Sequence, residues 1–182
     1  MKVISAETFL SAIWPSQLLR NETLELRARR QEDGKIEQKF LRSIKEFLRA
    51  AKSYGEGWDI YFGISTRFLQ GGKKSDCFRT CCVWVDLDKT PKLPDFGEIP
   101  PDFVVSSGGG FHVYWMLESP VYVRDNRWKQ IEAVNRGLTK KFNGDIMCPD
   151  ISRILRVPDT FNFKYNPPKK VIANAVLNTK VS

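Results

Sequence analysis

The stretch that most constrains the fold is VWVDLDK, residues 83–89, in which an apolar run ends in two acids. With Cys81 and Cys82 before it, the run is rich in β-forming residues and predicts a largely buried strand over 79–86. Side chains alternate along a strand, so Asp86 and Asp88 share one face with Trp84. Two neighbouring carboxylates repel each other unless a cation lies between them. The alternative is a strand end at which both acids are solvated.

Length and charge limit the class of protein. The chain has 182 residues, of which 42% are hydrophobic, so it can bury one sizeable core. We expect a single domain over 1–182, with an N-terminal portion (1–57) and a sheet portion (58–182). The formal net charge of +8 favours polyanionic partners such as nucleic acid or nucleotides. No run approaches the ~18 apolar residues of a membrane span, and no signal peptide is evident, so we expect no membrane partner.

The cysteines and the single histidine exclude several kinds of site. The four cysteines, Cys77, Cys81, Cys82 and Cys148, contain no CxxC spacing, so a zinc site is poorly supported. Buried, reduced thiols are the expected state, which fits a cytoplasmic protein. Because His112 is the only histidine, a histidine-rich zinc site and the paired-histidine motif of relaxases are excluded.

The pattern of apolar residues predicts a mixed order of elements. Expected helices cover 6–13 (capped by Ser5), 36–53, and a segment that Asp125 caps and Asn143-Gly144 ends. Expected strands cover 22–30 (with Leu24 and Leu26 inward), 58–65, 79–86, 103–107, 111–117 and 171–177. This order indicates an α+β fold with a mixed, largely antiparallel sheet flanked by helices.

A glycine turn precedes the histidine. Gly108-Gly109-Gly110 joins the strands 103–107 and 111–117 into a predicted hairpin. Glycines are retained where a side chain would obstruct or where φ must be positive, and one reason is the close approach of a ligand's phosphates. If this hairpin packs beside the strand 79–88, His112 faces Asp86 and Asp88. The alternative is a hydrogen-bonded structural histidine.

Two clustered acids suit Mg²⁺ or Mn²⁺, which prefer oxygen ligands. A two-metal site usually needs a third carboxylate, and the candidates are Asp145, Asp150 and Asp159. We favour Asp150, which precedes Arg153 and Arg156, and keep Asp145 in reserve. The two arginines would neutralise phosphate charge beside the metals. The alternative for this segment is a surface turn with ordinary salt bridges.

Other residues have two interpretations each. Arg67, Lys73 and Lys74 would grip a triphosphate or a nucleic-acid backbone, or they form a solvated basic loop. Trp84 and Tyr114 could stack on bases, although aromatic residues on strands are more often part of the core, which we favour for Trp84.

Three segments, in this order, carry a family resemblance: VWVDLD (83–88), SSGGGFHVYW (106–115) and DISRILRVPDTFNFK (150–164). They resemble the three motifs of the archaeo-eukaryotic primase (AEP) superfamily, in particular the primase-polymerase (PrimPol) branch of plasmid, phage and CRISPR-associated replication proteins. YFGIS followed by Arg67 resembles the segment before the first motif. The resemblance covers residues from about 58 to 164.

The resemblance implies an AEP-type catalytic core with an RRM-like sheet and template-directed nucleotidyl transfer from dNTPs or NTPs on single-stranded DNA, by priming, primer extension or both. It makes Asp86, Asp88 and Asp150 ligands of two Mg²⁺ or Mn²⁺ ions. Contacts to the nucleotide come from Ser107, Gly110, His112, Arg153, Arg156 and, before the first motif, Arg67. A helicase or accessory domain often accompanies such a module, so one alternative is that this chain is a fragment of a longer replication protein.

Two other functions stay open from the residues. A metal-dependent nuclease would use the same carboxylates but would not need a triphosphate grip. A non-catalytic, RRM-like module that binds single-stranded nucleic acid would read bases with exposed aromatic residues and would not need clustered acids.

Overall fold

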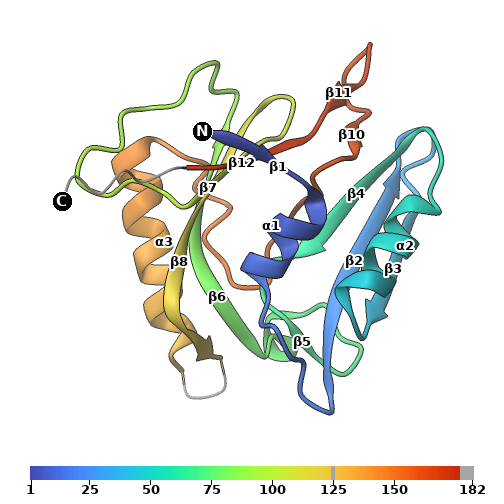
Figure 1. Ribbon diagram of the computed structural model, residues 1–182, viewed down its shortest axis with the longest axis horizontal. Coiled ribbons are helices and arrows are strands. Elements are labelled where there is room, and N and C mark those ends of the chain that lie inside the picture. Colours follow the sequence, from blue (N-terminus) through green and yellow to red (C-terminus); the bar gives the residue numbers. More distant parts are fainter. Residues whose placement is uncertain (124–125, 177–182) are drawn as a thin grey trace.

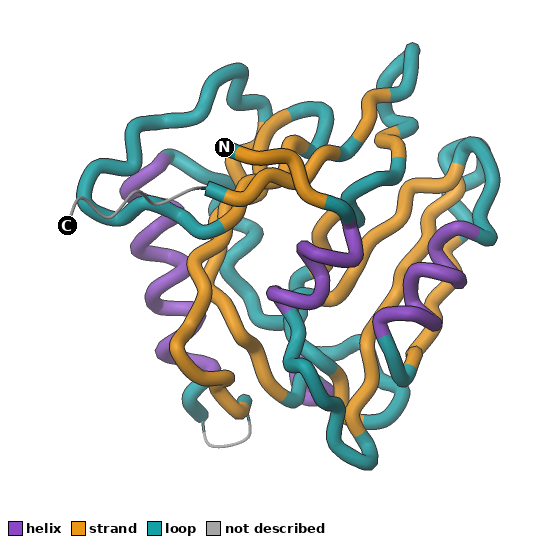
Figure 2. The backbone as a smooth tube through the Cα atoms, viewed as in Figure 1, coloured by secondary structure: helices purple, strands orange, loops and turns teal. Residues whose placement is uncertain are grey.

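The computed structural model describes residues 1–123 and 126–176, which form two five-stranded sheets, a two-stranded sheet and three α-helices (Figures 1 and 2). The helices are α1 (Ala6–Ile13), α2 (Ile44–Lys52) and α3 (Trp128–Phe142), and a short 3-10 turn spans Lys74–Asp76. Every strand pairing within the described residues is antiparallel. The α+β class and the largely antiparallel sheets predicted from the sequence are confirmed.

The first sheet has the order β1-β12-β7-β8-β6. Its strands are β1 (Lys2–Ile4), β12 (Ile172–Ala175), β7 (Phe103–Ser106), β8 (Gly110–Tyr122) and β6 (Arg79–Asp88). One face carries Val85, Leu87, Val104 and Val113, which pack with Phe142 of α3. The opposite face carries Trp84 and Tyr114, which join the main core between the two sheets. In Figure 1, α3 accordingly lies along the outer side of this sheet.

The second sheet has the order β3-β2-β4-β9, and β5 also pairs with β2. Its strands are β2 (Glu22–Arg30), β3 (Ile36–Leu41), β4 (Trp58–Gly63), β5 (Arg67–Phe68) and β9 (Ile154–Arg156). Leu24 and Leu26 of β2 are buried, as predicted. They share the main core with Phe9, Leu10 and Ile13 of α1, which lies between the sheets in Figure 1. A separate pair, β10 (Phe161–Asn162) and β11 (Lys169–Lys170), extends from the body.

The predicted helix over 36–53 is wrong in its first half. Residues 36–41 form β3, which pairs with β2 from Ile36 opposite Arg29 to Leu41 opposite Leu24. The helix α2 begins only after Ser43, whose side chain accepts a hydrogen bond from the backbone N–H of Glu46 at 3.2 Å. Strand pairing satisfies the backbone groups of 36–41, and the serine cap separates the strand from the helix.

The other predicted elements are close to those observed. Ser5 caps α1, the predicted hairpin is β7–β8, and Asn143 ends α3 in the left-handed conformation. The proposed cap Asp125 and the end of the predicted strand at Leu177 lie outside the described residues. The four cysteines are buried and unpaired, as expected. Within 1–123 and 126–176, the structure contains no helix that is both long and apolar enough to cross a membrane.

The expected boundary at residue 57, between the N-terminal portion and the sheet portion, does not coincide with the division into two sheets. Strand β1, from the N-terminal portion, pairs with β12 in the first sheet, and β4 pairs with β2 in the second. Strand β9 then joins β4 from far along the chain.

Candidate active site

The structure brings the first acid and the histidine together on neighbouring strands. Strands β6 and β8 pair in a register that places Asp86 opposite His112 and Asp88 opposite Gly110. Directly opposed residues of an antiparallel pair project from the same face, so the imidazole faces the carboxylate. His112 Nε2 lies 3.9 Å from Asp86 Oδ1. The predicted juxtaposition of the hairpin and the acidic strand is confirmed.

The His112 imidazole is almost fully buried. It is only 5% exposed, and Nδ1 has no hydrogen-bond partner among the described residues. Burial lowers the pKa of His112, the nearby Arg156 adds to this, and Asp86 opposes it. The ring is therefore neutral at neutral pH and keeps one nitrogen available as an acceptor.

Each glycine of the turn has a steric reason. Gly108 has φ +91°, and a Cβ on Gly109 would lie 2.1 Å from the Tyr165 hydroxyl oxygen. A Cβ on Gly110 would lie 2.0 Å from the carbonyl oxygen of Leu87 on β6. Ser107 closes the turn, since its hydroxyl donates to the carbonyl of Gly110 at 3.1 Å. Backbone conformation thus favours glycine at 108 and packing against β6 requires it at 110, whereas at 109 only the end of the Tyr165 side chain would have to move.

A cavity of about 130 Å³ opens in front of these strands. Five predicted site residues line it: Asp86, Asp88, Ser107, His112 and Arg156. The cavity also contains residues that sequence reasoning did not select: Tyr61, Gly109, Ile154, Leu155, Asn162, Lys164 and Tyr165. Asn162 and Lys164 belong to the motif 150–164. In FNFK they alternate with phenylalanine, and this alternation could have indicated that both polar side chains share one face of an extended segment.

Arg156 is fixed beside the acids by a buried partner. Its Nη1 lies 2.9 Å from Asp59 Oδ1, and its Nη2 donates to Asp59 Oδ2 at 3.1 Å. Asp59 is fully buried, and the guanidinium lies over the Tyr61 ring at 4.9 Å. Asn162 ties the neighbouring segment to the glycine turn, because its Nδ2 donates to the carbonyl of Ser107 at 2.7 Å. A positive group is therefore held in the wall of the cavity that contains Asp86 and Asp88.

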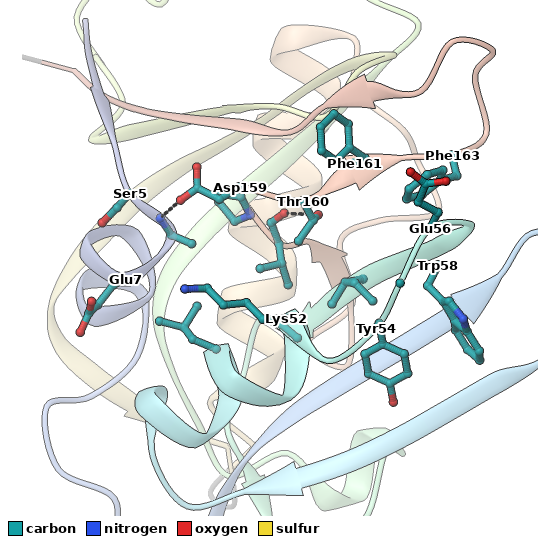
Figure 3. Close-up of a pocket in the computed structure, with 17 residues that line it drawn as sticks. Ser5, Glu7, Lys52, Tyr54, Glu56, Trp58, Asp159, Thr160, Phe161 and Phe163 are labelled. Carbon is teal, nitrogen blue, oxygen red and sulfur yellow. Dashed lines mark hydrogen bonds between the residues drawn. The ribbon is translucent and has the colours of Figure 1, made fainter.

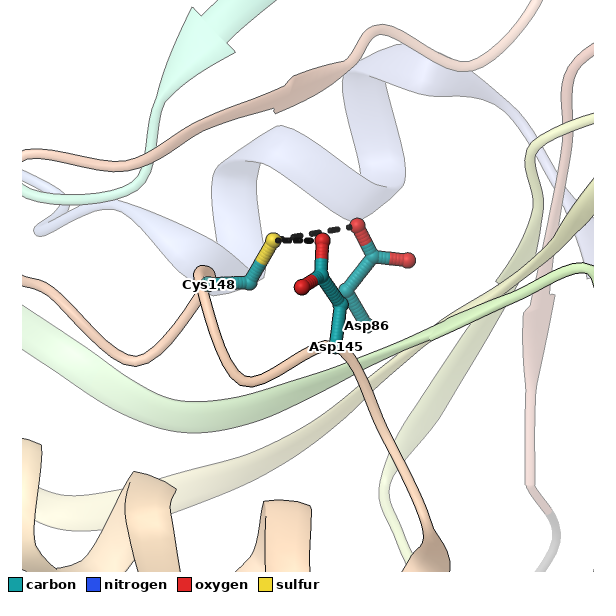
Figure 4. Close-up of side chains that lie close together, drawn as sticks. All are labelled: Asp86, Asp145 and Cys148. Carbon is teal, nitrogen blue, oxygen red and sulfur yellow. Dashed lines mark hydrogen bonds between the residues drawn. The ribbon is translucent and has the colours of Figure 1, made fainter.

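The third acid that the structure brings to Asp86 is Asp145. Its backbone N–H donates to the carbonyl of Asp86 at 2.8 Å. Hydrogen bonding by the backbone N–H of Met147 lowers the pKa of Asp145, so the group stays ionised. The Cys148 sulfur lies 3.4 Å from Asp86 Oδ2 and 3.2 Å from Asp145 Oδ2, so its single S–H is shared between the two carboxylates (Figure 4). One ligand atom from each of the three residues lies within 4.8 Å of the others.

Neither Asp150, the sequence-based choice for the third acid, nor Asp145 lines the cavity, and the two differ in their contacts. The Asp150 carboxylate accepts from the backbone N–H of Ser152 at 3.1 Å and from Arg153 Nη2 at 2.8 Å, whereas Asp145 lies beside Asp86. Arg153 is likewise absent from the cavity wall, and the pair forms a local salt bridge, the alternative considered for this segment. Asp159 is also elsewhere, since it accepts from the backbone N–H of Ala6 at the start of α1 at 2.7 Å.

Arg67 does not lie where a nucleotide could reach it. The side chain is fully buried, and Nε donates to Glu25 Oε2 at 2.6 Å. The remaining guanidinium nitrogens bond the Cys77 sulfur and the carbonyl of Ser152. The predicted contact of Arg67 with the nucleotide is corrected accordingly: within the described residues, Arg67 is an internal brace between β5 and the segment before β9.

The basic loop and the strand aromatics have structural partners. Lys73 is exposed, whereas Lys74 pairs with Glu132 at 2.5 Å and lies 4.0 Å from the Trp128 ring. Trp84 and Tyr114 are fully buried, so neither stacks on bases.

A second cavity, of about 420 Å³, lies between α1, α2, β4 and the segment 157–163 (Figure 3). Apolar and aromatic residues dominate its wall, including Leu48, Trp58, Ile60, Phe161 and Phe163. It is larger than the cavity at Asp86, and its wall includes Asp159, one of the candidates for the third acid, but none of Asp86, Asp88, His112 and Arg156. The clustered acids, the histidine and the arginine therefore identify the smaller cavity as the candidate active site.

The comparisons of sequence give a partial match. No protein-family model matches the chain. A replication protein from Clostridium perfringens is 28% identical over 120 residues, which are 58% of this chain and 30% of the relative. The match thus spans less than a third of that protein's length.

Two solved structures cover most of the chain. The AEP domain of the primase-polymerase of cyanophage S-2L matches with a TM-score of 0.63 and 19% identity, covering 85% of this chain and 82% of that one. The catalytic domain of primase RepB′, solved with initiator DNA, matches with a TM-score of 0.62 and 14% identity, covering 85% of this chain and 76% of that one. The chain therefore has the α+β fold of AEP primase domains, as the resemblance of its motifs led us to expect.

Proposed function

We propose that this chain is the catalytic domain of a DNA primase-polymerase, which joins nucleotides from dNTPs or NTPs on a single-stranded DNA template. The observation that carries the proposal is the register of β6 and β8, which sets Asp86 opposite His112, so that Asp86, Asp88 and His112 line one cavity together with Arg156. The fold of AEP primases and the similarity to a replication protein support the same class of reaction.

The donor set fits Mg²⁺ or Mn²⁺. Asp86 and Asp145 supply carboxylate oxygens a few ångströms apart, and Asp88 follows Asp86 on the same face of β6. Clustered carboxylates match the oxygen ligands that hard cations prefer. We propose Asp86, Asp88 and Asp145 as the ligands, so that Asp145 replaces Asp150. Bound divalent cations would activate the attacking 3′-hydroxyl and neutralise charge on the leaving pyrophosphate.

The side chains around the acids would orient the triphosphate. Arg156 projects a delocalised positive charge that Asp59 and Tyr61 hold in one orientation. Lys164 adds a second positive group to the cavity wall. The neutral His112 would contact a phosphate oxygen as a hydrogen-bond donor, and its burial keeps water from competing. Arg153 acts through Asp150 and contributes to the shape of the segment that carries Arg156.

The partners proposed for this chain are a DNA template, a primer strand and nucleoside triphosphates. The primase RepB′ was solved in complex with initiator DNA, and the net charge of +8 suits a polyanionic partner. The relative from Clostridium perfringens is more than three times as long as the matched segment. We therefore propose that this domain works together with a helicase or accessory domain in a longer replication protein.

A gel assay tests the proposal. The chain is incubated with single-stranded DNA, nucleoside triphosphates and Mg²⁺ or Mn²⁺, with and without an annealed primer. New strands without primer would establish priming, and extension only from a primer would establish a polymerase. The double variant Asp86→Asn/Asp88→Asn should abolish both products. Glu98→Gln, which removes an exposed acid in the loop between β6 and β7, is the matched control and should retain activity.

Other results would favour the other two functions. Shortening of the template without synthesis would favour the nuclease. DNA binding without any chemistry, unchanged or strengthened in the Asp86→Asn/Asp88→Asn variant, would favour the non-catalytic binding module.

A further inference from the structure

The acids of the candidate active site have a sulfur neighbour that a site for hard cations does not require. Cys148 is 6% exposed, and its sulfur lies within hydrogen-bond distance of a carboxylate oxygen of Asp86 and one of Asp145 (Figure 4). A thiol donor adds nothing to Mg²⁺ binding, because Mg²⁺ prefers oxygen ligands. Thiolate ligands instead select borderline and soft cations, of which Zn²⁺ is the common biological example.

Three hydrogen bonds fix the backbone that carries the Cys148 sulfur. The backbone N–H of Cys148 donates to the carbonyl of Asp145 at 3.1 Å, and the carbonyl of Cys148 accepts from Trp84 Nε1 at 3.0 Å. The next residue, Pro149, is fixed to α3, since its carbonyl accepts from Asn135 Nδ2 at 3.1 Å. Trp84 and Asn135 are fully buried, so the position of the thiol is set by the core rather than by a free loop.

The distances between donors fit a tetrahedral centre. Zinc bonds to sulfur and to carboxylate oxygen place two such ligands roughly 3.6 Å apart in a tetrahedral site. The Cys148 sulfur lies 3.4 Å from Asp86 Oδ2 and 3.2 Å from Asp145 Oδ2, so small shifts would suffice.

A second observation points to a ligand at the same place. His112 is 5% exposed, its Nδ1 has no partner among the described residues, and Nε2 faces the other oxygen of Asp86 at 3.9 Å. That separation is too long for a direct hydrogen bond. The imidazole is thus an almost fully buried polar group that borders the Asp86 carboxylate from the side of the cavity without bonding it.

We propose that Asp86, Asp145 and Cys148 form a mixed oxygen-and-sulfur site that binds a thiophilic divalent cation, Zn²⁺ or Cd²⁺, in competition with Mg²⁺ and Mn²⁺. On binding, the S–H bond of Cys148 breaks, its proton passes to solvent, and a sulfur–metal bond forms. That such an ion inhibits synthesis rests on the proposed function; that the ion binds does not.

The test is a titration of the full chain with Cd²⁺, followed by the ultraviolet charge-transfer absorption of the cadmium–thiolate bond. We expect one Cd²⁺ per chain in the wild type and loss of this absorption in Cys148→Ser. Cys81→Ser, which alters a buried thiol at the start of β6, is the matched control and should keep it. Excess Mn²⁺ should displace the bound Cd²⁺. An absorption that is missing in the wild type, or that persists in Cys148→Ser, would overturn the proposal.

Two further arms keep the result interpretable. If Cys148→Ser does not fold by circular dichroism, Asp145→Asn retains the thiol and should weaken Cd²⁺ binding about tenfold or more; unchanged affinity would refute the site. In the synthesis assay, Zn²⁺ should inhibit the wild type at concentrations about tenfold or more below those that inhibit Cys148→Ser. A chain without synthesis activity would fail the proposed function, while the absorption would still decide the metal site.

Discussion

The backbone N–H of Asp145 donates to the carbonyl of Asp86 at 2.8 Å, which ties the loop after α3 to the acidic end of β6. The two carboxylates are thereby brought to one place although they belong to distant parts of the chain. Asp150, closer to the arginines in sequence, bonds Ser152 and Arg153 instead. Which acid lies beside Asp86 is therefore a consequence of how the loop 143–149 attaches to the sheet.

Asp145→Asn and Asp150→Asn test this assignment directly. Removal of the Asp145 charge should reduce primer extension about 100-fold or more, because a metal ligand contributes several kcal/mol of charge stabilisation. Asp150→Asn should keep activity within several-fold of the wild type, since its carboxylate bonds Ser152 and Arg153 and does not join the cluster at Asp86. The measurement is kcat for single-nucleotide addition at saturating Mn²⁺. The reverse order of effects would restore Asp150 as the third ligand.

Gly144→Ala should disable the site through the loop. A Cβ at Gly144 would lie 2.8 Å from the carbonyl oxygen of Asp86 and 2.4 Å from Val85 Cγ2, so the loop must move. A displacement of this kind costs about 100-fold in rate when it shifts a catalytic group by an ångström. Overpacking should also lower the free energy of unfolding by about 1–3 kcal/mol.

Gly137→Ala is the matched control for that substitution. Gly137 lies within α3, and a Cβ there meets nothing within 4 Å. It should leave activity intact and stabilise the helix by up to about 1 kcal/mol. Primer extension and urea unfolding on both variants check the pair. Full activity in Gly144→Ala would show that the loop does not have to stay close to β6.

Arg156→Gln should weaken nucleotide binding. Loss of hydrogen bonds to a charged phosphate should raise KM for the incoming nucleotide about 10-fold to 100-fold. Arg156→Lys should recover only part of the loss, because an ammonium cannot replace the planar fork that Asp59 orients. Arg136→Gln, on the exposed side of α3, is the control. A KM unchanged in Arg156→Gln would remove this residue from the nucleotide site.

Arg67→Met should act on stability rather than on nucleotide binding. Arg67 and Glu25 form an ion pair in which both side chains are fully buried. Removal of the cation leaves the Glu25 carboxylate without one of its partners. We therefore expect the free energy of unfolding to fall by about 3 kcal/mol. Urea denaturation gives this value, and KM measured on the folded fraction should stay near that of the wild type. Unchanged stability with a raised KM would restore the contact first predicted from the sequence.

Local sequence patterns were sufficient for the strands that form the site. The two-residue repeat of VWVDLD predicted that Asp86 and Asp88 share a face, and the β-rich run after the glycines predicted a strand that starts near His112. The mutual approach of these strands followed from one further assumption, that they pair, and the register confirms it. In contrast, helical spacing over 36–53 was misleading, because an edge strand that pairs on one side only can show the same apolar spacing.

The sequence alone is enough to identify the reactive side chains and their order along the chain. They are two acids on one strand, a glycine turn, a histidine, further acids, and a basic segment after those acids. The tertiary structure alone decided which of these meet. Arg67 became internal because Glu25 lies beside it across the second sheet, whereas Asp145 and Cys148 reached Asp86 because α3 and Trp84 anchor their loop. Such contacts depend on which surfaces pack together, and no short-range spacing encodes that choice.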